Sequence, residues 1–218
     1  MPDSDPYFDA RRRMIEEQFC SHSPPVSNAR VIEAMGRVPR HEFVPAESRN
    51  EAYGDYPIPI GYSQTISQPY IVALMTELLD PKPDERILEI GTGSAYQAAV
   101  LAEMAGEVYS IEIVPELGQR ASEVLSRLGY ENIHLKVDDG YRGWPEEAPF
   151  DAIIVTCAPD HVPPPLVEQL KESGKMLIPV GGEYEVQELF LLEKRGNSLE
   201  KQEIIRVRFV PMTGESQK

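Results

Sequence analysis

The chain has 218 residues, of which 41% are hydrophobic and 26% are charged. A chain of this length is long enough for one α/β domain with a sizeable core. The composition is that of an ordinary globular protein, which argues against general disorder. With 36 acidic residues against 21 Lys and Arg, the net charge is −15. Such a charge repels phosphate backbones and anionic lipid, which argues against a broad nucleic-acid or membrane surface.

The two cysteines, Cys20 and Cys157, are far apart and form no C-x-x-C pair. The sequence therefore suggests neither a disulfide framework nor a zinc site, and no metal is expected. Residues 1–13 contain no apolar stretch, and no other segment approaches the roughly 20 apolar residues that a membrane span needs. We expect a cytoplasmic protein with no membrane partner.

Two helices are predicted to open the chain. The first covers residues 8–19, and the second follows a possible cap at Ser27, with apolar residues at helical spacing from Val31 to Val38. Residues 39–69 then contain five prolines and two glycines without a sustained period. This pattern predicts irregular backbone, and loops of this length inside a compact domain are often functional.

From Ile71 onward, helix and strand patterns alternate. A helix face from Ile71 to Leu78 leads into a short buried strand at 86–90 that runs into Gly91. Further strands are predicted at 108–113, 133–137, 151–156 and 175–180, with helices at 96–104, 117–128 and around 166–170 between them. This alternation predicts a parallel sheet with helices on both faces.

The C-terminal part breaks the alternation. Two strand-like runs, 186–193 and 203–210, are joined by Gly196 and Asn197 with no helix between them, which predicts a hairpin on the sheet edge. The predicted fold is α/β, with a doubly wound, mostly parallel sheet, N-terminal helices and a C-terminal antiparallel hairpin.

We expect a single domain over 1–218. Its predicted parts are the N-terminal helices and substrate loop (1–80), a cofactor-binding core (81–182) and the hairpin (183–218).

The first predicted strand ends in a glycine turn, Glu89 to Tyr96 (EIGTGSAY), that leads into a helix. Open α/β sheets hold nucleotide-like ligands at such a turn. A glycine pair by itself is weak evidence, because it also fits a simple tight turn. Tyr96 occupies the position where a dinucleotide fingerprint needs a small residue, so NAD is disfavoured.

Acidic residues follow the first three strands of the core. Glu89 would repel a pyrophosphate but suits a ligand that carries a sulfonium and an amino group. Glu112 ends the second strand, about 20 residues beyond the turn, where an acidic residue reaches ribose hydroxyls. After the third strand, residues 138–140 (DDG) could accept from an adenine amino group, although a turn or helix cap explains them equally well. Together these residues predict S-adenosylmethionine, with Thr156 to Ala158 bordering the same crevice.

Residues 57–70 (PIPIGYSQTISQPY) precede the helix that leads into the first strand, so this loop could lie over the cofactor crevice. Its polar side chains are candidate substrate contacts. Taken alone, Ser67 is more often a helix cap than a catalytic group. Pro69 at a first helical position would instead make Gln68 the cap and leave Ser67 free.

Several segments together resemble the protein-L-isoaspartate O-methyltransferase family, and the resemblance covers nearly all of the chain from about Val31 onward. These segments are 57–79, 87–102, 143–156, 178–181 and 209–212. The most specific one is Gln64 to Pro69 (QTISQP), because the glycine loop occurs across many methyltransferases. The chain departs from the family where glycine is common, at Ser63, at Ala95 and in the pair Ser173-Gly174. A glycine at the first of these positions permits positive φ.

The resemblance implies a Rossmann-like methyltransferase fold and methyl transfer from S-adenosylmethionine to the α-carboxylate of L-isoaspartyl residues in damaged proteins or peptides. S-adenosylhomocysteine is the implied product, and the implied role is protein repair. The resemblance assigns Ser67 as the active-site residue. With Glu89 added from its charge, the residues expected at the cofactor are Gln64, Thr65, Ile66, Glu89, Gly91, Thr92, Gly93, Ser94, Glu112, Asp139, Gly140 and Thr213, and those expected at the substrate are Thr65, Ser67 and Thr156.

Two other classes stay open. A small-molecule or nucleic-acid methyltransferase would share the core, although the chain has no basic stripe for nucleic acid. A catalytically idle cofactor-binding module would keep the glycine loop but need not keep the loop around Ser67. The four histidines are scattered, and Ser67 is in no G-x-S-x-G elbow, so a serine hydrolase is not indicated. We expect damaged proteins or peptides as partners, no nucleic acid, and a monomer.

Overall fold

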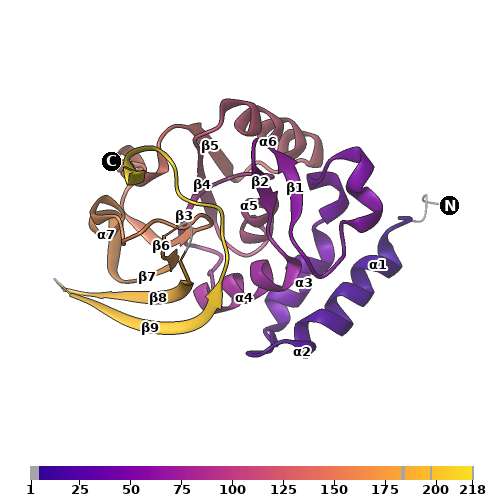
Figure 1. The fold of residues 1–218 in the computed structure, drawn as a ribbon, viewed down its shortest axis with the longest axis horizontal. Helices are drawn as coiled ribbons and strands as arrows, with labels where there is room; N and C mark the ends of the chain where they lie inside the picture. The colour runs from indigo at the N-terminus through magenta and orange to yellow at the C-terminus, as the bar shows by residue number, and fades with distance from the viewer. Residues whose placement is uncertain (1–4, 183–184, 197, 218) are drawn as a thin grey trace.

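The computed structural model describes residues 5–182, 185–196 and 198–217. Its centre is a seven-stranded sheet in the order β5-β4-β3-β6-β7-β8-β9 (Figure 1). The strands are β3 (Arg86–Ile90), β4 (Glu107–Glu112), β5 (Ile133–Val137), β6 (Phe150–Val155), β7 (Leu170–Val180), β8 (Gln187–Arg195) and β9 (Ser198–Val207). Strands β3 to β7 are parallel, and β8 and β9 are antiparallel. The predicted fold class is confirmed, while Asn197 of the predicted hairpin lies outside the described residues.

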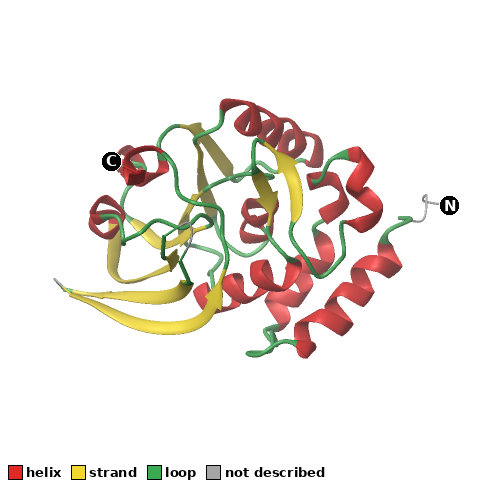
Figure 2. Cartoon of the chain, viewed as in Figure 1, coloured by secondary structure: helices red, strands yellow, loops and turns green. Residues whose placement is uncertain are grey.

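Helices cover both faces of the sheet, because successive strand residues point to opposite sides. On one face, Met75 of α4 (Pro69–Leu79) and Leu101 of α5 (Tyr96–Ala102) pack in one cluster with Ile87 of β3. On the other face, Leu88 of β3 packs in a cluster with Leu166 of α7 (Pro164–Gln169). Helix α6 (Pro115–Leu128) connects β4 to β5 and ends at Gly129, as predicted. Figure 2 shows the strands lying between these helices.

The order of the strands determines where a ligand can bind. From β3 the chain adds β4 and β5 on one side of the sheet and then β6 and β7 on the other. The strand order therefore reverses between β3 and β6, and open α/β sheets bind ligands outside the carboxyl ends of the strands at such a point. The glycine turn directly follows β3 and lies there.

The N-terminal helices differ from the prediction in detail. The first is a continuous helical run of α1 (Phe8–Arg13), a π-helical turn η1 (Met14–Gln18) and α2 (Phe19–Ser21). The second, α3 (Ala29–Arg37), is capped by Asn28, whose side chain accepts from the Arg30 amide at 3.0 Å. The predicted cap at Ser27 was wrong, because the helix begins one residue later, after Asn28. The backbone amides of Ser27 and Asn28 both donate to the Glu77 carboxylate, at 2.8 and 2.6 Å.

Residues 39–69 are more regular than predicted. They form the 3-10 turns η2 (Arg40–Phe43) and η3 (Ala46–Glu51), followed by an antiparallel hairpin of β1 (Ile58–Gly61) and β2 (Gln64–Ile66). The two prolines at 57 and 59 obscured the strand pattern, although the isoleucines of the hairpin alternate into the core. Further 3-10 turns are η4 (Gly140–Arg142), η5 (Pro145–Glu147) and η6 (Gly214–Gln217).

The three departures from the glycines of the resembled family share one backbone feature. Ser63, Ala95 and Ser173 have φ of 57°, 69° and 60°. All three lie in the left-handed region, which costs an L-residue roughly 1–2 kcal/mol. The turns are therefore formed without glycine at the cost of some local strain.

Across the described residues, no helix combines the length and the apolar character needed to cross a membrane.

Candidate functional site

A cavity opens at the carboxyl ends of β3, β4 and β6. Its walls are the glycine turn, strand β2 with the residue after it, and the segment that follows β9. The lining residues are Gln64, Thr65, Ile66, Ser67, Val72, Ile90, Gly91, Thr92, Gly93, Ser94, Tyr96, Gln97, Ile111, Glu112, Ile113, Gly140, Thr156, Cys157, Val210, Pro211, Met212 and Thr213. The fold thus brings together all the predicted site residues except Glu89 and Asp139, which lie outside this lining.

The glycine turn is fixed by its neighbours. Gly91 has φ of 97°, and a Cβ there would lie 2.5 Å from Oγ1 of Thr156. That hydroxyl donates to the Gly91 carbonyl at 2.7 Å, and the amides of Gly91 and Thr92 donate to the Ile111 carbonyl at 2.9 and 3.1 Å. Only glycine meets both the conformation and the close approach at this position. The Thr156 hydroxyl therefore supports the turn in addition to lining the cavity.

Glu112 is the only charged side chain among the described residues that line the cavity. It ends β4 and is 6% exposed. Its Oε2 accepts from the Gly93 amide at 2.7 Å, and its Oε1 accepts from the Val114 amide at 2.9 Å. A carboxylate has further lone pairs on both oxygens, so a ligand hydroxyl could donate to it. The two amides hold the carboxylate in one orientation.

Glu89 lies behind the turn and is completely buried. The Ser110 hydroxyl donates to its Oε2, and Ser110 Oγ lies 2.6 Å from Thr92 Oγ1. The other oxygen, Oε1, has no hydrogen-bond partner among the described residues. Burial raises the pKa of Glu89 to about 8; the charge of Glu112 adds to this increase, and the Ser110 hydrogen bond opposes it. A cation bound in the cavity would favour the ionised form.

Asp139 organises the chain beside the cavity. Its carboxylate accepts from the Tyr141 amide at 3.0 Å and from the Glu215 amide at 2.8 Å. The first contact caps η4, which is the alternative that the sequence left open, and the second ties down the C-terminal segment that follows Thr213. Gly140 lines the cavity, and a Cβ there would lie 2.5 Å from Cγ2 of Ile90.

Ser67 lies between β2 and α4. Helix α4 starts with Pro69 at its first position and Gln68 as the N-cap residue, so that prediction is confirmed. Within the described part of the chain, the Ser67 hydroxyl makes no hydrogen bond, and Ser67 lines both the cavity and an adjoining groove. The groove lining is Pro57, Thr65, Ser67, Gln68, Ile71, Thr156, Arg206, Val207, Arg208, Phe209, Val210 and Pro211. Ser67 therefore stands where the two hollows meet.

Arg40 holds the backbone of Ser67 in place, a contact that the sequence did not predict. Its guanidinium is completely buried, donates to the Ser67 carbonyl at 2.7 Å and to the Ala52 carbonyl at 2.6 Å, and lies 4.8 Å from the ring centroid of Tyr96. Burial lowers the pKa of Arg40 to about 10, so the group remains charged at pH 7. No local sequence pattern connects residue 40 to residue 67.

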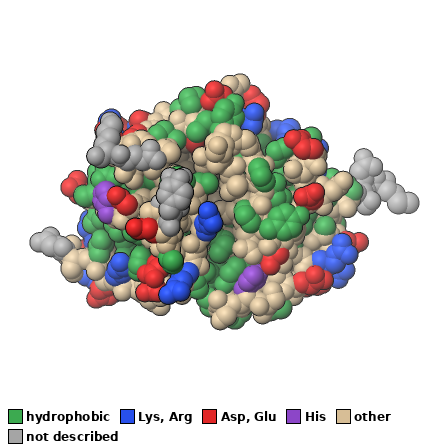
Figure 3. All heavy atoms as spheres, viewed as in Figure 1, with side chains coloured by type: hydrophobic (Ala, Val, Ile, Leu, Met, Phe, Trp, Pro, Cys, Tyr) green, Lys and Arg blue, Asp and Glu red, His purple; other side chains and the backbone are tan. Residues whose placement is uncertain are grey.

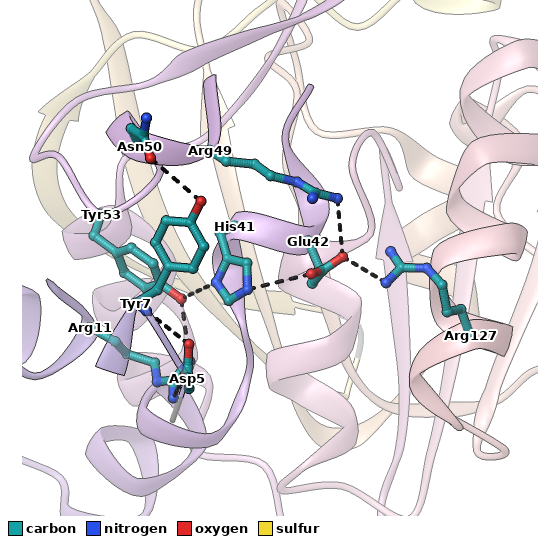
Figure 4. Close-up of polar contacts among 9 residues, drawn as sticks. All are labelled: Asp5, Tyr7, Arg11, His41, Glu42, Arg49, Asn50, Tyr53 and Arg127. Atoms are coloured by element: carbon teal, nitrogen blue, oxygen red, sulfur yellow. Dashed lines mark hydrogen bonds and ion pairs between the residues drawn. The ribbon is translucent and has the colours of Figure 1, made fainter. Parts of the chain in front are cut away.

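A polar network fixes the turn that carries Arg40 (Figure 4). His41 Nδ1 lies 2.8 Å from the Tyr53 hydroxyl, and the His41 ring stacks on Tyr7 with centroids 4.1 Å apart. The carboxylate of Glu42 forms ion pairs with Arg127 of α6 at 2.6 Å and with Arg49 at 3.4 Å. Burial lowers the pKa of His41. None of the four histidines is in the lining of the cavity or the groove.

Sequence reasoning also missed the apolar part of the cavity. The segment after β9 contributes Val210 and Met212, and its path is set by the Met212 amide, which donates to the Ala158 carbonyl at 2.8 Å. Cys157 lines the cavity, and burial, together with the charges of Glu112 and Asp139, raises the pKa of its thiol to about 12. The thiol stays protonated at pH 7, so it is not a nucleophile.

A sequence model of the protein-L-isoaspartate(D-aspartate) O-methyltransferase family matches residues 14–217. The chain belongs to this family. It is 54% identical to protein-L-isoaspartate O-methyltransferase 2 of Syntrophobacter fumaroxidans, over 96% of this chain and 88% of that protein. It is 51% identical to the protein-L-isoaspartate O-methyltransferase of a Picosynechococcus species, over 98% of this chain and 94% of that one.

Solved structures of the family agree with this assignment. A protein-L-isoaspartate O-methyltransferase, 30% identical, superposes with a TM-score of 0.84 over 94% of this chain and 66% of that chain. A structure from Plasmodium falciparum, described as a protein-L-isoaspartate O-methyltransferase in complex with S-adenosyl-L-homocysteine, is 25% identical. It superposes with a TM-score of 0.80 over 95% of this chain and 98% of that chain.

Proposed function

We propose that this member of the family is a repair enzyme that transfers a methyl group from S-adenosylmethionine to the α-carboxylate of L-isoaspartyl residues in damaged proteins and peptides. The observation that carries the proposal is the position of Ser67. It belongs to the segment most specific to the family and lies where the cavity beside the glycine turn meets the groove. A donor in the cavity and an acceptor in the groove would meet at this residue.

The residues of the cavity fit S-adenosylmethionine. Its only charged lining residue among those described is Glu112, and the buried Glu89 behind the turn has an oxygen without a partner. The charge of Glu112 favours a cationic ligand over a pyrophosphate, and a bound cation would in turn favour the ionised form of Glu89, whose raised pKa keeps it mostly protonated at pH 7. Glu112, together with Gly93 and Gly140 of the same lining, would hold the adenosyl part, and residues Gln64 to Ile66 and Thr213 would close the cavity.

The reaction requires positioning of the methyl donor and the accepting carboxylate rather than acid or base catalysis. Bound S-adenosylmethionine supplies an electrophilic methyl group. The accepting carboxylate is already ionised at pH 7, so the chain needs no general base. We infer that the Ser67 hydroxyl donates to this carboxylate and aims one of its oxygens, because alignment of the reacting atoms dominates such a step. Thr65 and Thr156, which line both hollows, would contact the same substrate group.

Methylation of matched peptides tests the proposal. The protein is incubated with radiolabelled S-adenosylmethionine and two peptides that differ only in an aspartyl or isoaspartyl linkage. Label is expected in the isoaspartyl peptide alone, since only this peptide offers an α-carboxylate at the damaged position. Equal labelling of both peptides, or labelling of neither, would overturn the proposal.

We also infer that the protein works as a monomer in the cytoplasm and binds no nucleic acid. Both cysteines are free, which suits a reducing compartment. The net charge of −15 opposes contact with phosphate backbones. Light scattering during gel filtration would test the monomer.

A further inference from the structure

The groove beside Ser67 differs in charge from the rest of the molecule. The whole chain has a net charge of −15, and acidic and basic side chains are scattered over the face drawn in Figure 3. Among the described residues, the groove lining contains two arginines, Arg206 and Arg208, and no acidic side chain. The groove is therefore a locally positive site on an acidic protein.

Both arginines are exposed, and within the described residues neither forms a hydrogen bond or an ion pair. Glu188 is the cross-strand neighbour of Arg206, but no ion pair joins them within 4.0 Å. Most other arginines of the chain do have acidic partners, as Arg11 has Asp5 and Arg127 has Glu42. The guanidinium groups of Arg206 and Arg208 are thus free to bind an anion that enters the groove.

The cavity and the groove have opposite charges. Of the residues that the structure describes, the charged ones are Glu112 in the cavity lining and the two arginines in the groove lining, and none of those shared by the two linings is charged. That shared wall is formed by Thr65, Ser67, Thr156, Val210 and Pro211. A cationic donor and an anionic acceptor are therefore drawn to different sides of the residue where we place the reaction.

We propose that Arg206 and Arg208 form a subsite for a second carboxylate of the peptide substrate, separate from the carboxylate that is methylated. This inference rests on the function proposed above. The second carboxylate is either an acidic side chain near the damaged residue or the C-terminal carboxylate of the peptide. Arginine suits this role because its planar guanidinium donates two parallel hydrogen bonds to one carboxylate.

The chain sets the distance at which the second carboxylate should lie. Val210 lines both hollows, and Arg208 and Arg206 precede it by two and four residues. An extended chain advances at most about 3.5 Å per residue, so the guanidinium-bearing residues lie within about 7 and 14 Å of Val210 along the backbone. An extended peptide in the groove would place an acidic residue two to four positions from the isoaspartyl residue opposite them.

Steady-state methylation of matched peptides tests the subsite. The peptides are isoaspartyl peptides with amidated C-termini, identical except for Glu or Gln two, three or four residues from the damaged residue, on either side. A third set keeps Gln and has a free C-terminal carboxylate. The enzymes are wild type, the double variant R206Q/R208Q, and the control R13Q/R195Q, which removes two positive charges from exposed arginines outside the groove lining.

For wild type, we expect kcat/KM to be about two- to fivefold higher for the Glu peptide than for its Gln partner, at the best position and at low salt. The preference should disappear in R206Q/R208Q, persist in R13Q/R195Q, and weaken in 0.5 M salt because exposed charges are screened. A preference that follows the free C-terminus instead identifies chain ends as the source of the carboxylate.

Three results would overturn the subsite. They are equal methylation of the Glu and Gln peptides by wild type, an undiminished preference in R206Q/R208Q, and an equal loss in the control. Equal methylation of the Glu and Gln isoaspartyl peptides would contradict the subsite but not the proposed function. Absence of methylation in every isoaspartyl peptide would instead refute the function itself.

Discussion

Within the described part of the chain, the Ser67 hydroxyl makes no hydrogen bond, and the same holds for the cavity-lining hydroxyls of Thr65 and Thr213. The hydroxyls of Thr92 and Thr156, in contrast, have hydrogen-bond partners at 3.0 Å or less. A hydroxyl without a partner can donate to a substrate at no cost in internal hydrogen bonds. This freedom arises because Gln68, and not Ser67, is the N-cap residue of α4.

The variant Ser67→Ala should therefore slow methylation without weakening cofactor binding. We expect kcat to fall about 10- to 100-fold, because a hydrogen bond to a charged group contributes roughly 1.5–3 kcal/mol. The dissociation constant of S-adenosylhomocysteine, measured by calorimetry, should change less than about twofold. Ser126→Ala, on the exposed face of α6, is the control. An unchanged kcat in Ser67→Ala would refute the role.

Arg40 acts on the site through the backbone, as a positioning residue. In Arg40→Met the carbonyls of Ala52 and Ser67 lose their donor, and we expect unfolding free energy to fall by about 2–4 kcal/mol. The kcat for peptide methylation should also fall, while the KM for S-adenosylmethionine should change little. Arg40→Lys keeps the charge and reaches one carbonyl at most, so its kcat should be intermediate. Wild-type kcat in folded Arg40→Met would show that Arg40 only supports the fold.

At the level of the elements, three residues adopt positive φ at positions where the family commonly has glycine. Ser63 in the β1–β2 turn and Ser173 in the first half of β7 are exposed residues with positive φ, whereas Ala95 before α5 is fully buried. Replacing a left-handed residue by glycine removes strain but adds freedom to the unfolded chain. The balance therefore depends on whether the lost side chain was packed.

We expect Ser63→Gly and Ser173→Gly each to raise the free energy of unfolding by about 0.5–1 kcal/mol, as the relief of strain exceeds the entropic cost. Ala95→Gly should have almost no net effect, because the loss of a buried methyl group offsets the relief. Urea unfolding of the three variants measures this order. A destabilised Ser63→Gly would show that its φ carries no strain.

For the molecule as a whole, the titration of Glu89 makes the free energy of unfolding depend on pH. Its pKa is raised from 4.5 to about 8 in the folded state, so the folded protein binds a proton more tightly than the unfolded chain does. Stability from this group is complete below about pH 4.5 and is lost as pH rises to about 8, at a slope of up to about 1.4 kcal/mol per pH unit. Ionisation at higher pH leaves a buried charge with one oxygen that has no hydrogen-bond partner among the described residues.

Between pH 6 and pH 8, wild type should lose about 2 kcal/mol of unfolding free energy more than Glu89→Gln does. Glutamine keeps the shape and the contact with Ser110 but does not titrate in this range. Urea unfolding at the two pH values measures the difference. The same pH dependence in both proteins would assign the effect to another group.

The sequence by itself determined what depends on neighbours in the chain. Periodicity predicted the strands and helices from Ile71 to the hairpin, although β7 begins at Leu170 and not at 175, and the last strand covers Ser198–Val207 and not 203–210. The run after β3 predicted the glycine turn. The positions of Glu112 and Gly140 at strand ends followed from the parallel order, because parallel strands bring their carboxyl ends to one edge of the sheet. These features need only local pattern and topology.

Tertiary structure alone decided what depends on partners distant in sequence. Glu77 binds the backbone amides before α3, and the buried Arg40 holds the backbone of Ser67. The groove places Arg206 and Arg208, at the end of β9 and just after it, beside a loop over a hundred residues earlier in the chain. Hydrogen bonds and charges act between groups that lie close in space. A local sequence pattern therefore cannot predict which distant residues the fold brings together.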